Sequence, residues 1–267
     1  MTEQNPTASA WSAARVAEIL LTAERSQTSR TSIQAEWPGL TLDVAYAAQD
    51  IALADRRAHG ETVTGIKLGL TSRAKQQQMG VDKPSVAWLT DAMALPAGLP
   101  VPRGKLIHPR AEPEIAFVLD RPLAGPGVTA AQALAAVEYV TTAIEIIDSR
   151  YSGFKFTLED AVADNNSSGA YVTGPVLKRP DEVDLSLEAC LLEVDGDIVD
   201  SATGSAVLGH PAEALAFAAN TFGVRGVTLE AGWVVLTGGM TDAVAVAPGS
   251  RVAAHFTSLG SITLAGG

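Results

Sequence analysis

Two glutamates, Glu112 and Glu114, stand on either side of Pro113 at the head of an apolar run that continues from Ile115 to Leu119. On a β-strand, side chains two positions apart point to the same face, so a strand here directs both carboxylates to one side. The apolar run favours a buried strand, and two buried like charges destabilise a fold unless something neutralises them. A divalent cation that prefers oxygen ligands is the simplest neutraliser.

A third carboxylate, that of Glu145, lies between Ile144 and Ile146 in a second apolar run. Three carboxylates that converge from two strands make an oxygen site suited to Mg²⁺ or Mn²⁺, with water or substrate oxygens in the remaining positions. Zinc is less suited, because His108 is the only histidine nearby and no thiol is available. The pattern alone is equally compatible with acids that lie on a polar strand face or pair with arginine.

The composition restricts the class of protein. The chain has 267 residues, 47% of them hydrophobic, which is enough for one large domain or for a main domain with a helical appendage. The formal net charge of -11 argues against a nucleic-acid partner. Cys190 is the only cysteine, which excludes a disulfide scaffold and a cysteine-based zinc site. No apolar run approaches the ~20 residues of a membrane span, and residues 1–10 lack a signal-peptide pattern, so we expect a cytoplasmic protein without a membrane partner.

Hydrophobic spacing divides the chain into an N-terminal helical segment, residues 1–60, and a β-rich domain, residues 61–267, that contains the three acids. Helices are expected over 11–25, 41–60, 72–79, 129–139 and 210–222. Strands are expected over 65–70, 114–119, 140–147, 170–174, 189–194, 233–237, 251–256 and 261–264, with a hairpin turn at Asp195-Gly196. These strands do not alternate regularly with helices, so the pattern predicts an α+β fold with a mixed or antiparallel sheet.

Lys67 lies between Gly65 and Gly69 in a short apolar strand. A lysine at such a position either extends to the surface or points into a cleft. In a cleft beside a metal ion, its ammonium group could bind a carboxylate or act as an acid or base. Both interpretations remain open on the sequence alone.

Three further segments could contact a ligand. Residues 164–169 are dense in hydrogen-bonding side chains and end in glycine, which suits either a carboxylate cradle or an ordinary turn. Lys155 stands between two phenylalanines, so it could point away from both rings on the opposite face. Gly239 follows a predicted strand, where a glycine permits either a close backbone approach by a ligand or a tight turn. The sequence contains no P-loop, dinucleotide-binding or Ser-His-Asp pattern, and His59, His210 and His255 lack metal-ligand spacing.

Four segments occur in an order that resembles a known family: Gly65–Ser72, the Glu112/Glu114 pair, Ile146–Arg150 and Val162–Ser168. Together they are similar to the hydratase/decarboxylase family of catechol meta-cleavage pathways, over roughly residues 11–264. The resemblance implies a fumarylacetoacetate hydrolase-like fold, with a mixed β-sheet or barrel core, a small N-terminal helical part, and residues 61–267 as the catalytic domain.

The same resemblance implies the composition of the active site. Glu112, Glu114 and Glu145 match the positions that bind Mg²⁺ or Mn²⁺, and Lys67 matches a catalytic position. The segment with Ser167 and Ser168 is placed near the substrate carboxylate. With these two serines, the candidates for substrate binding are Leu70, Lys155 and Gly239.

Three other segments look more like the decarboxylases of the family than like its hydratases: residues 107–110, 149–156 and 238–244. Hydratases commonly resemble Pro-Asp-Tyr-Gly where this chain has Pro84-Ser85-Val86-Ala87, so an acid useful for adding water is missing, although Asp82 is close in sequence. The expected reaction is therefore the metal-dependent decarboxylation of (3E)-2-oxohex-3-enedioate to 2-hydroxypenta-2,4-dienoate, with a small 2-oxo dicarboxylate as substrate.

Other activities stay open at this point. The first is a hydratase that adds water to 2-hydroxypentadienoate, and the second is a non-catalytic subunit that associates with such a hydratase. A third is carbon–carbon cleavage of acylpyruvates, for which His108 is the only nearby candidate to activate water with a glutamate. The resemblance also implies a homo-oligomer and a complex with vinylpyruvate hydratase.

Overall fold

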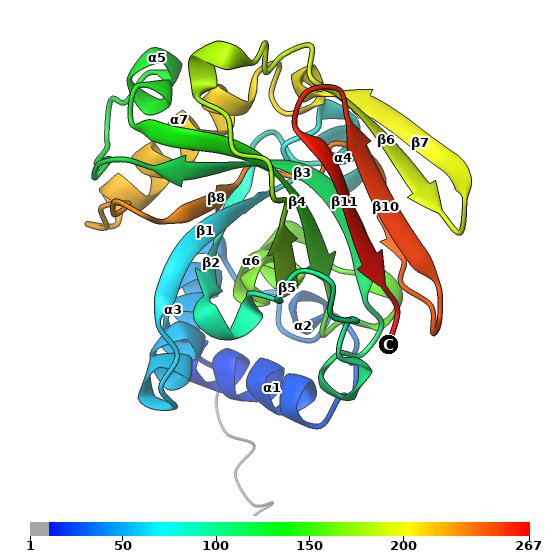
Figure 1. Cartoon of the computed structure of the whole chain (residues 1–267). Helices are drawn as coiled ribbons and strands as arrows, with labels where there is room; N and C mark the ends of the chain where they lie inside the picture. The colour runs from blue at the N-terminus through cyan, green and yellow to red at the C-terminus, as the bar shows by residue number, and fades with distance from the viewer. Residues whose placement is uncertain (1–10) are drawn as a thin grey trace, which may run out of the picture.

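The computed structural model describes residues 11–267, which build two β-sheets with helices packed around them (Figure 1). Residues 1–10, the polar start of the expected helical segment, lie outside the described part of the chain. No helix within residues 11–267 is long and apolar enough to cross a membrane.

The larger sheet has seven strands in the order β2-β1-β8-β3-β4-β5, with β9 paired to β3. Its strands are β1 (Val63–Gly69), β2 (Ser85–Thr90), β3 (Arg110–Leu119), β4 (Val137–Ile147), β5 (Ser168–Thr173), β8 (Val234–Leu236) and β9 (Val244–Ala245). All pairs are antiparallel except β1 with β8. Gly65 permits that parallel pair, because a Cβ at this position would lie 2.0 Å from the Val234 carbonyl oxygen.

The smaller sheet has four antiparallel strands in the order β11-β10-β6-β7. They are β6 (Ala189–Val194), β7 (Asp197–Thr203), β10 (Arg251–Phe256) and β11 (Gly260–Ala265). The Asp195-Gly196 turn between β6 and β7 forms as expected, with positive φ at both residues. The main hydrophobic core draws on both sheets and on helix α7 (Pro211–Val224).

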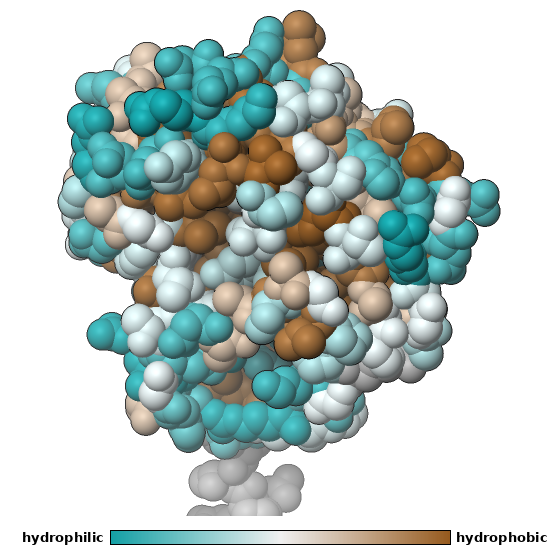
Figure 2. Space-filling model, viewed as in Figure 1, coloured by the Kyte–Doolittle hydropathy of each residue, from teal (hydrophilic) through white to brown (hydrophobic). Residues whose placement is uncertain are grey.

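The remaining helices are α1 (Ala13–Arg25), α2 (Ile33–Glu36), α3 (Leu42–Ala58), α4 (Arg73–Met79), α5 (Ala130–Leu134) and α6 (Leu158–Ala163). A second core lies where α1, α2 and α3 pack with α6, below the larger sheet in Figure 1. Ser12 and Thr41 cap α1 and α3, each accepting a backbone N–H of the first turn. On the face seen in Figure 2, apolar side chains gather over the middle of the molecule, while polar ones dominate its upper and lower parts.

The α+β prediction is confirmed, with local differences, of which three involve the strands and the loop around the site. The helix expected over 129–139 ends at Leu134, because Val137, Tyr139 and Val140 join β4 and pair with β3. The segment 85–90 forms the fully buried strand β2, which the sequence reading did not anticipate as a strand. Helix α6 was also not expected; its Thr157 forms a capping box with Asp160.

Candidate metal centre and active site

The three glutamates come together on neighbouring strands. Glu112 and Glu114 lie two residues apart on β3, and Glu145 on β4 is the direct cross-strand partner of Glu112. One carboxylate oxygen from each residue lies within 4.8 Å of the other two. Glu114 and Glu145 are almost completely buried. The register of two antiparallel strands therefore produces the cluster that the i, i+2 spacing predicted.

Burial raises the pKa of Glu114 well above its ordinary value, and the charge of Glu145 raises it further. Burial also raises the pKa of Glu145, although the Lys67 ammonium opposes the shift. Glu112 differs: burial alone would raise its pKa, but Lys75, together with the more weakly acting Lys67 and Arg110, offsets this effect and the pKa is lowered. Without a further cation, burial therefore makes two of the three carboxyls harder to ionise than an ordinary glutamate.

The donor set fits a hard divalent cation. Within residues 11–267, no hydrogen-bond donor reaches Glu114 Oε1 or Glu145 Oε2, and both atoms are buried. Buried carboxylate oxygens without donors destabilise a fold, and a cation such as Mg²⁺ or Mn²⁺ satisfies them with the oxygen ligands it prefers. Of Glu114, only Oε2 is bound by the chain, as it accepts the Gly238 N–H at 2.7 Å.

Lys67 points into the interior from β1. Its Nζ lies 2.9 Å from Glu145 Oε1 and donates to the Asn166 carbonyl oxygen at 2.8 Å. The side chain is only 3% exposed, so it does not extend to the surface. This geometry places a cation beside the carboxylate cluster and next to the loop after α6.

The opposite side of the cluster carries Lys75 of α4. Its Nζ lies 2.7 Å from Glu112 Oε1 and donates to the Thr241 carbonyl at 3.1 Å. Gly239 packs directly against the Glu112 carboxylate, since a Cβ on it would lie 2.8 Å from Glu112 Oε2. Gly239 is thus explained by the close approach of a glutamate rather than by the turn alone.

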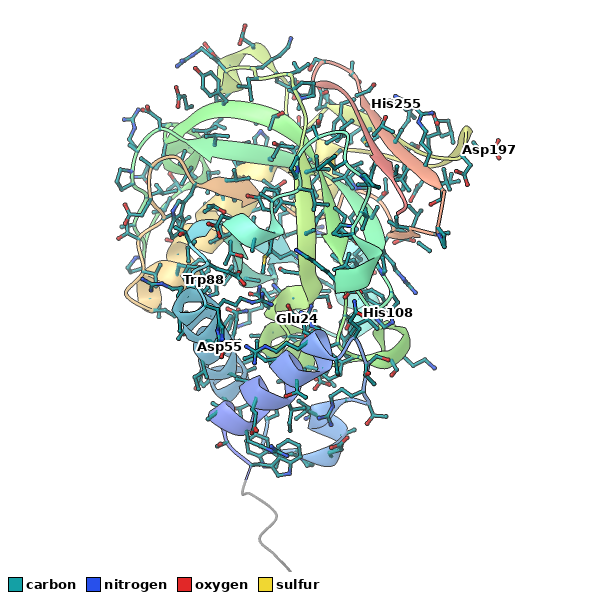
Figure 3. The ribbon with its side chains drawn as sticks, turned by 60° about the horizontal axis from the view of Figure 1, so that its bottom comes forward. Glu24, Asp55, Trp88, His108, Asp197 and His255 are labelled. Carbon is teal, nitrogen blue, oxygen red and sulfur yellow. The ribbon has the colours of Figure 1, made fainter. Side chains whose placement is uncertain are left out.

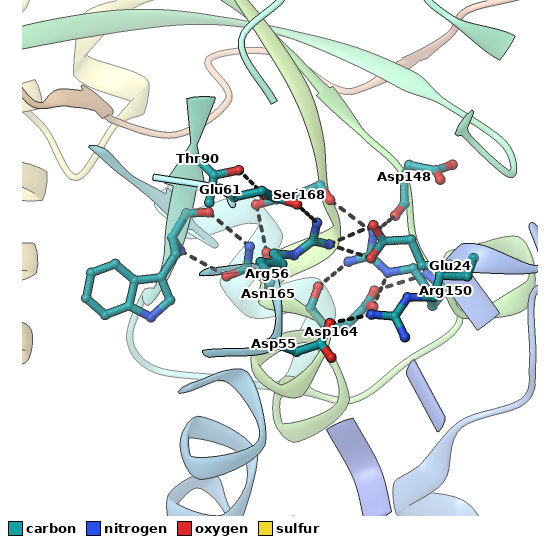
Figure 4. A network of polar contacts seen from close by, with 12 residues as sticks. Glu24, Asp55, Arg56, Glu61, Thr90, Asp148, Arg150, Asp164, Asn165 and Ser168 are labelled. Atoms are coloured by element: carbon teal, nitrogen blue, oxygen red, sulfur yellow. Dashed lines mark hydrogen bonds and ion pairs between the residues drawn. The ribbon is translucent and has the colours of Figure 1, made fainter. Parts of the chain in front are cut away.

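The loop after α6 is held from behind by a buried ion pair between Arg150 and Asp164 (Figure 4). Arg150 also donates to the carbonyl oxygens of Asp148 and Ser168, at 2.7 and 3.0 Å. In front, Asn165 exchanges two hydrogen bonds with the backbone of Trp88 in β2. These contacts maintain positive φ angles at Asn165, Asn166 and Ser167, which turn the Asn166 carbonyl toward Lys67.

A cavity of about 400 Å³ opens beside Glu112. Of the predicted site residues, its wall includes Lys67, Leu70, Glu112, Ser167 and Gly239. The wall also contains three apolar side chains from a single stretch of chain, Phe154, Phe156 and Ala161. A cavity of this size, with charged side chains and aromatic rings in its wall, is suited to a small ligand.

Two predicted substrate-binding residues do not line this cavity. Lys155 is exposed, and the rings on either side of it, Phe154 and Phe156, face the cavity in its place. Ser168 is buried and its hydroxyl donates to the Asn165 carbonyl at 2.8 Å, so it supports the loop. Of the two adjacent serines, the structure therefore places Ser167 at the cavity.

Among the lining residues that were not predicted, three are charged: Lys75, Arg110 and Asp242. Arg110 stands two residues before Glu112, so the alternation that paired the glutamates could have identified it. His108 does not line the cavity: its buried Nε2 has no partner within residues 11–267, and its ring lies 4.9 Å from that of Phe154. His108 and His255 lie far apart in the molecule (Figure 3).

The fold and the site together define a class of protein. A model of the fumarylacetoacetate (FAA) hydrolase C-terminal family matches residues 62–264, and the chain belongs to this family. Within it, the chain is 41% identical over 248 residues to a 4-oxalocrotonate decarboxylase of Pseudomonas putida, covering 93% of this chain and 94% of the relative.

Two further family members are similar to the chain over most of its length. The chain is 40% identical to a 2-keto-4-pentenoate hydratase of Burkholderia vietnamiensis (strain G4 / LMG 22486) over 94% of this chain and 96% of the relative. Among solved structures, the 4-oxalocrotonate decarboxylase of Pseudomonas putida G7, complexed with magnesium and adipate, superposes with a TM-score of 0.92 at 39% identity, covering 95% of this chain and 96% of that one.

Proposed function

We propose that the protein is a divalent-metal-dependent decarboxylase that converts (3E)-2-oxohex-3-enedioate (4-oxalocrotonate) into 2-hydroxypenta-2,4-dienoate and CO₂. The observation that carries the proposal is the cluster of Glu112, Glu114 and Glu145, of which Glu112 lines a cavity, in a chain with 41% identity to a 4-oxalocrotonate decarboxylase. The relative with TM-score 0.92 holds magnesium and adipate, which is a six-carbon dicarboxylate like the proposed substrate.

Glu112, Glu114 and Glu145 would hold Mg²⁺ or Mn²⁺ through the carboxylate oxygens that face one another. The bound ion would supply positive charge next to the 2-oxo group, where negative charge develops in the reaction. Glu114 Oε1 and Glu145 Oε2, which have no donor among the described residues, are the atoms with lone pairs free for this purpose.

The reaction breaks the bond between C5 and C6 of the substrate. C6 leaves as CO₂, the bonding electron pair forms the C4–C5 double bond, and the former C3–C4 π pair shifts toward C2 and its oxygen. We assign proton donation to the C2 oxygen to Lys67 Nζ, a role supported by its position between Glu145 and the Asn166 carbonyl. Its protonated form also counters the charge that accumulates there.

The cavity wall contributes by excluding water. Leu70, Phe154 and Phe156 line the same space as Lys67, so the departing carboxylate faces apolar surface on one side. Loss of water destabilises a carboxylate more than it destabilises neutral CO₂, which favours the bond cleavage. Ser167 lines the cavity while its hydroxyl donates to Asp164 at 3.4 Å, and we assign it to orienting the substrate.

A hydratase is the alternative, and two observations disfavour it. The segment 84–87 carries no acid, and Asp82, the nearest acid in sequence, is exposed and lies outside the cavity. Acylpyruvate cleavage is disfavoured as well, since His108 does not line the cavity that contains Glu112.

The test is a side-by-side assay of purified protein with 2-oxohex-3-enedioate and with 2-hydroxypenta-2,4-dienoate, each with Mg²⁺ and with EDTA. Metal-dependent release of CO₂ from the first substrate, with little loss of the ultraviolet absorbance of the second, supports the decarboxylase. The reverse pattern would identify a hydratase. Turnover of neither substrate would favour a non-catalytic subunit, and a Glu112→Gln variant that still forms the complex with the hydratase would then support that role.

We further propose that the enzyme works in the cytoplasm as a homo-oligomer, in association with the vinylpyruvate hydratase that consumes its product. The β6–β7 hairpin at the side of the smaller sheet exposes apolar side chains, including Leu191, Ile198 and Val199, which supports a contact with another subunit. Sedimentation of the purified protein, alone and mixed with a hydratase, tests both associations.

A further inference from the structure

Arg110 occupies the cavity wall in line with the metal-binding acids. It lies on β3 two residues before Glu112 and four before Glu114, so the three side chains leave the same face of the strand. Each step of two residues advances about 6.6 Å along a strand. Arg110 therefore marks a position in the cavity displaced from the metal centre, on the side of Glu112 away from Glu114.

The guanidinium of Arg110 is held flat by an aromatic ring. Its Cζ lies 4.3 Å from the centre of the Phe154 ring, and both residues line the cavity. Stacking on an aromatic face restricts the side chain while leaving the edge of the guanidinium free for hydrogen bonds. Phe154 thus fixes a planar donor in the wall of the cavity.

Arg110 differs from the other cations of this wall in its pairing. Lys67 lies 2.9 Å from Glu145, and Lys75 lies 2.7 Å from Glu112. Arg110 has no carboxylate within ion-pair distance among residues 11–267, although its charge contributes to the lowered pKa of Glu112 and the cavity also borders the exposed Asp242. A half-buried arginine without an acid, in a chain of net charge -11, is available to an anionic ligand.

We propose that Arg110, oriented by Phe154, binds the substrate carboxylate remote from the metal and so selects dicarboxylates over monocarboxylates. This inference rests on the proposed function, because it takes the 2-oxo acid end of the substrate to lie at the glutamate triad. The planar fork of an arginine matches the two oxygens of a carboxylate, which a lysine does not.

The role has a kinetic signature. The remote carboxylate is charged in the bound substrate and loses its charge as CO₂ forms, so Arg110 holds the substrate more strongly than the transition state. An interaction of this kind lowers KM and does not raise kcat. Substitution of Arg110 should therefore raise KM for 2-oxohex-3-enedioate while kcat stays constant or increases.

The test compares two ligands that differ only at the remote end, 2-oxohexanedioate and 2-oxohexanoate, by calorimetric binding to the Mg²⁺-loaded protein. Wild type should prefer the dicarboxylate. Arg110→Met should weaken binding of 2-oxohexanedioate about tenfold or more and leave 2-oxohexanoate within about twofold. Arg110→Lys should recover only part of the preference. Arg121→Met, which removes an exposed arginine that pairs with Asp120 at the surface, is the matched control and should change neither.

Equal weakening of both ligands by Arg110→Met would overturn the proposal, because it would mean that Arg110 supports Glu112 and the metal site. Equal affinities in wild type would overturn it as well. Since binding is measured without turnover, a protein that releases no CO₂ but shows the Arg110-dependent preference would refute the decarboxylase while leaving this inference in place.

Discussion

Two clusters of buried charge flank the Asn165–Ser168 loop, and they differ in how completely their groups are paired. Behind the loop, Arg150 donates to Asp164, Asp148 and Ser168, and Asp164 also accepts the backbone N–H of Arg150 at 3.1 Å (Figure 4). In front of it, two of the carboxylate oxygens of the glutamate triad lack donors among the described residues. Both clusters are largely buried, yet only the first is satisfied by the protein itself.

The difference distinguishes a structural role from a functional one. Breaking a satisfied buried ion pair leaves an uncompensated charge, so such a pair is costly to disrupt and holds its surroundings in place. An unsatisfied set of like charges destabilises the folded chain and is explained by a ligand that completes it. The Arg150–Asp164 pair thus fixes the loop that positions Lys67, whereas the glutamate triad is suited to bind a cation.

The largest effect is expected in the unsatisfied cluster. Glu114→Gln should reduce decarboxylation on the order of 1000-fold, since it removes a direct metal ligand, whereas loss of supporting groups alone costs about 10- to 100-fold. The same variant should melt at a higher temperature than wild type in EDTA, because it removes a buried charge next to Glu145. Glu138→Gln, on the same strand as Glu145 but outside the triad, is the control and should match wild type in both measurements. A Glu114→Gln protein with a lower melting temperature than wild type in EDTA would contradict the inference that the buried like charges of the triad destabilise the metal-free protein.

The next largest effect is expected in the Arg150–Asp164 cluster. There, removal of a charge should destabilise the metal-free protein rather than stabilise it. Asp164→Asn should lower the free energy of unfolding by about 3 kcal/mol, because it leaves the Arg150 guanidinium buried without its counter-charge. Urea denaturation with EDTA present measures this. Asp181→Asn, at an exposed acid, should change the value by less than about 0.5 kcal/mol. Similar losses in both variants would mean that the buried pair has no special structural role.

The third prediction concerns pH. The pKa values of Glu114 and Glu145 are raised by burial, so the metal-free folded protein retains protons that the unfolded chain has released. Its stability should therefore fall as pH rises above the unfolded value of 4.5. Mg²⁺ requires the deprotonated carboxylates, so its stabilising effect, about 2.7 kcal/mol at 100 times Kd, should grow as pH rises.

Thermal melts with Mg²⁺ and with EDTA between about pH 5 and 8 measure this difference. Burial also raises the pKa of Asp164 to about 6, but that group titrates in both samples and cancels in the comparison. A Mg²⁺ effect that is independent of pH would contradict the proton–metal competition.

The smallest effect is expected at Gly239, whose backbone packs against the Glu112 carboxylate of the glutamate triad. Gly239→Ala places a Cβ 2.8 Å from the Glu112 carboxylate, which must then move away from the cluster. We expect the Kd for Mg²⁺ to rise about tenfold, as when groups that orient a ligand are disturbed. Gly104→Ala, where a Cβ meets nothing within 4 Å, is the control. Unchanged Mg²⁺ affinity in Gly239→Ala would show that Glu112 tolerates displacement.

The contrast between the clusters also marks what the sequence could predict. Strand alternation and the apolar neighbours drew attention to the three glutamates, but this pattern was equally compatible with acids on a polar strand face, and the resemblance to a known family was needed to assign them to a metal. The Arg150–Asp164 pair was not predicted, because it joins two positions outside regular strands. It also depends on helix α6, for which the sequence shows no strong helical pattern. The position of Lys155 shows a related limit: its side chain points away from the rings of Phe154 and Phe156, as expected, but alternation does not say which of the two faces borders the cavity, and the rings occupy that face.

The order of strands has a consequence for synthesis of the protein. Lys67 is on β1 and the three glutamates are on β3 and β4, but β8 lies between β1 and β3 in the sheet. Because β8 (Val234–Leu236) follows β2 to β7 in the chain, a ribosome has already produced every one of those strands before the piece that joins them exists. During translation the nascent chain therefore carries a β1–β2 hairpin and a β3–β4–β5 meander with facing unpaired edges, and such edges invite pairing with other chains. We expect chaperone dependence to be highest in this interval, and the active site to be among the last parts of the molecule to form.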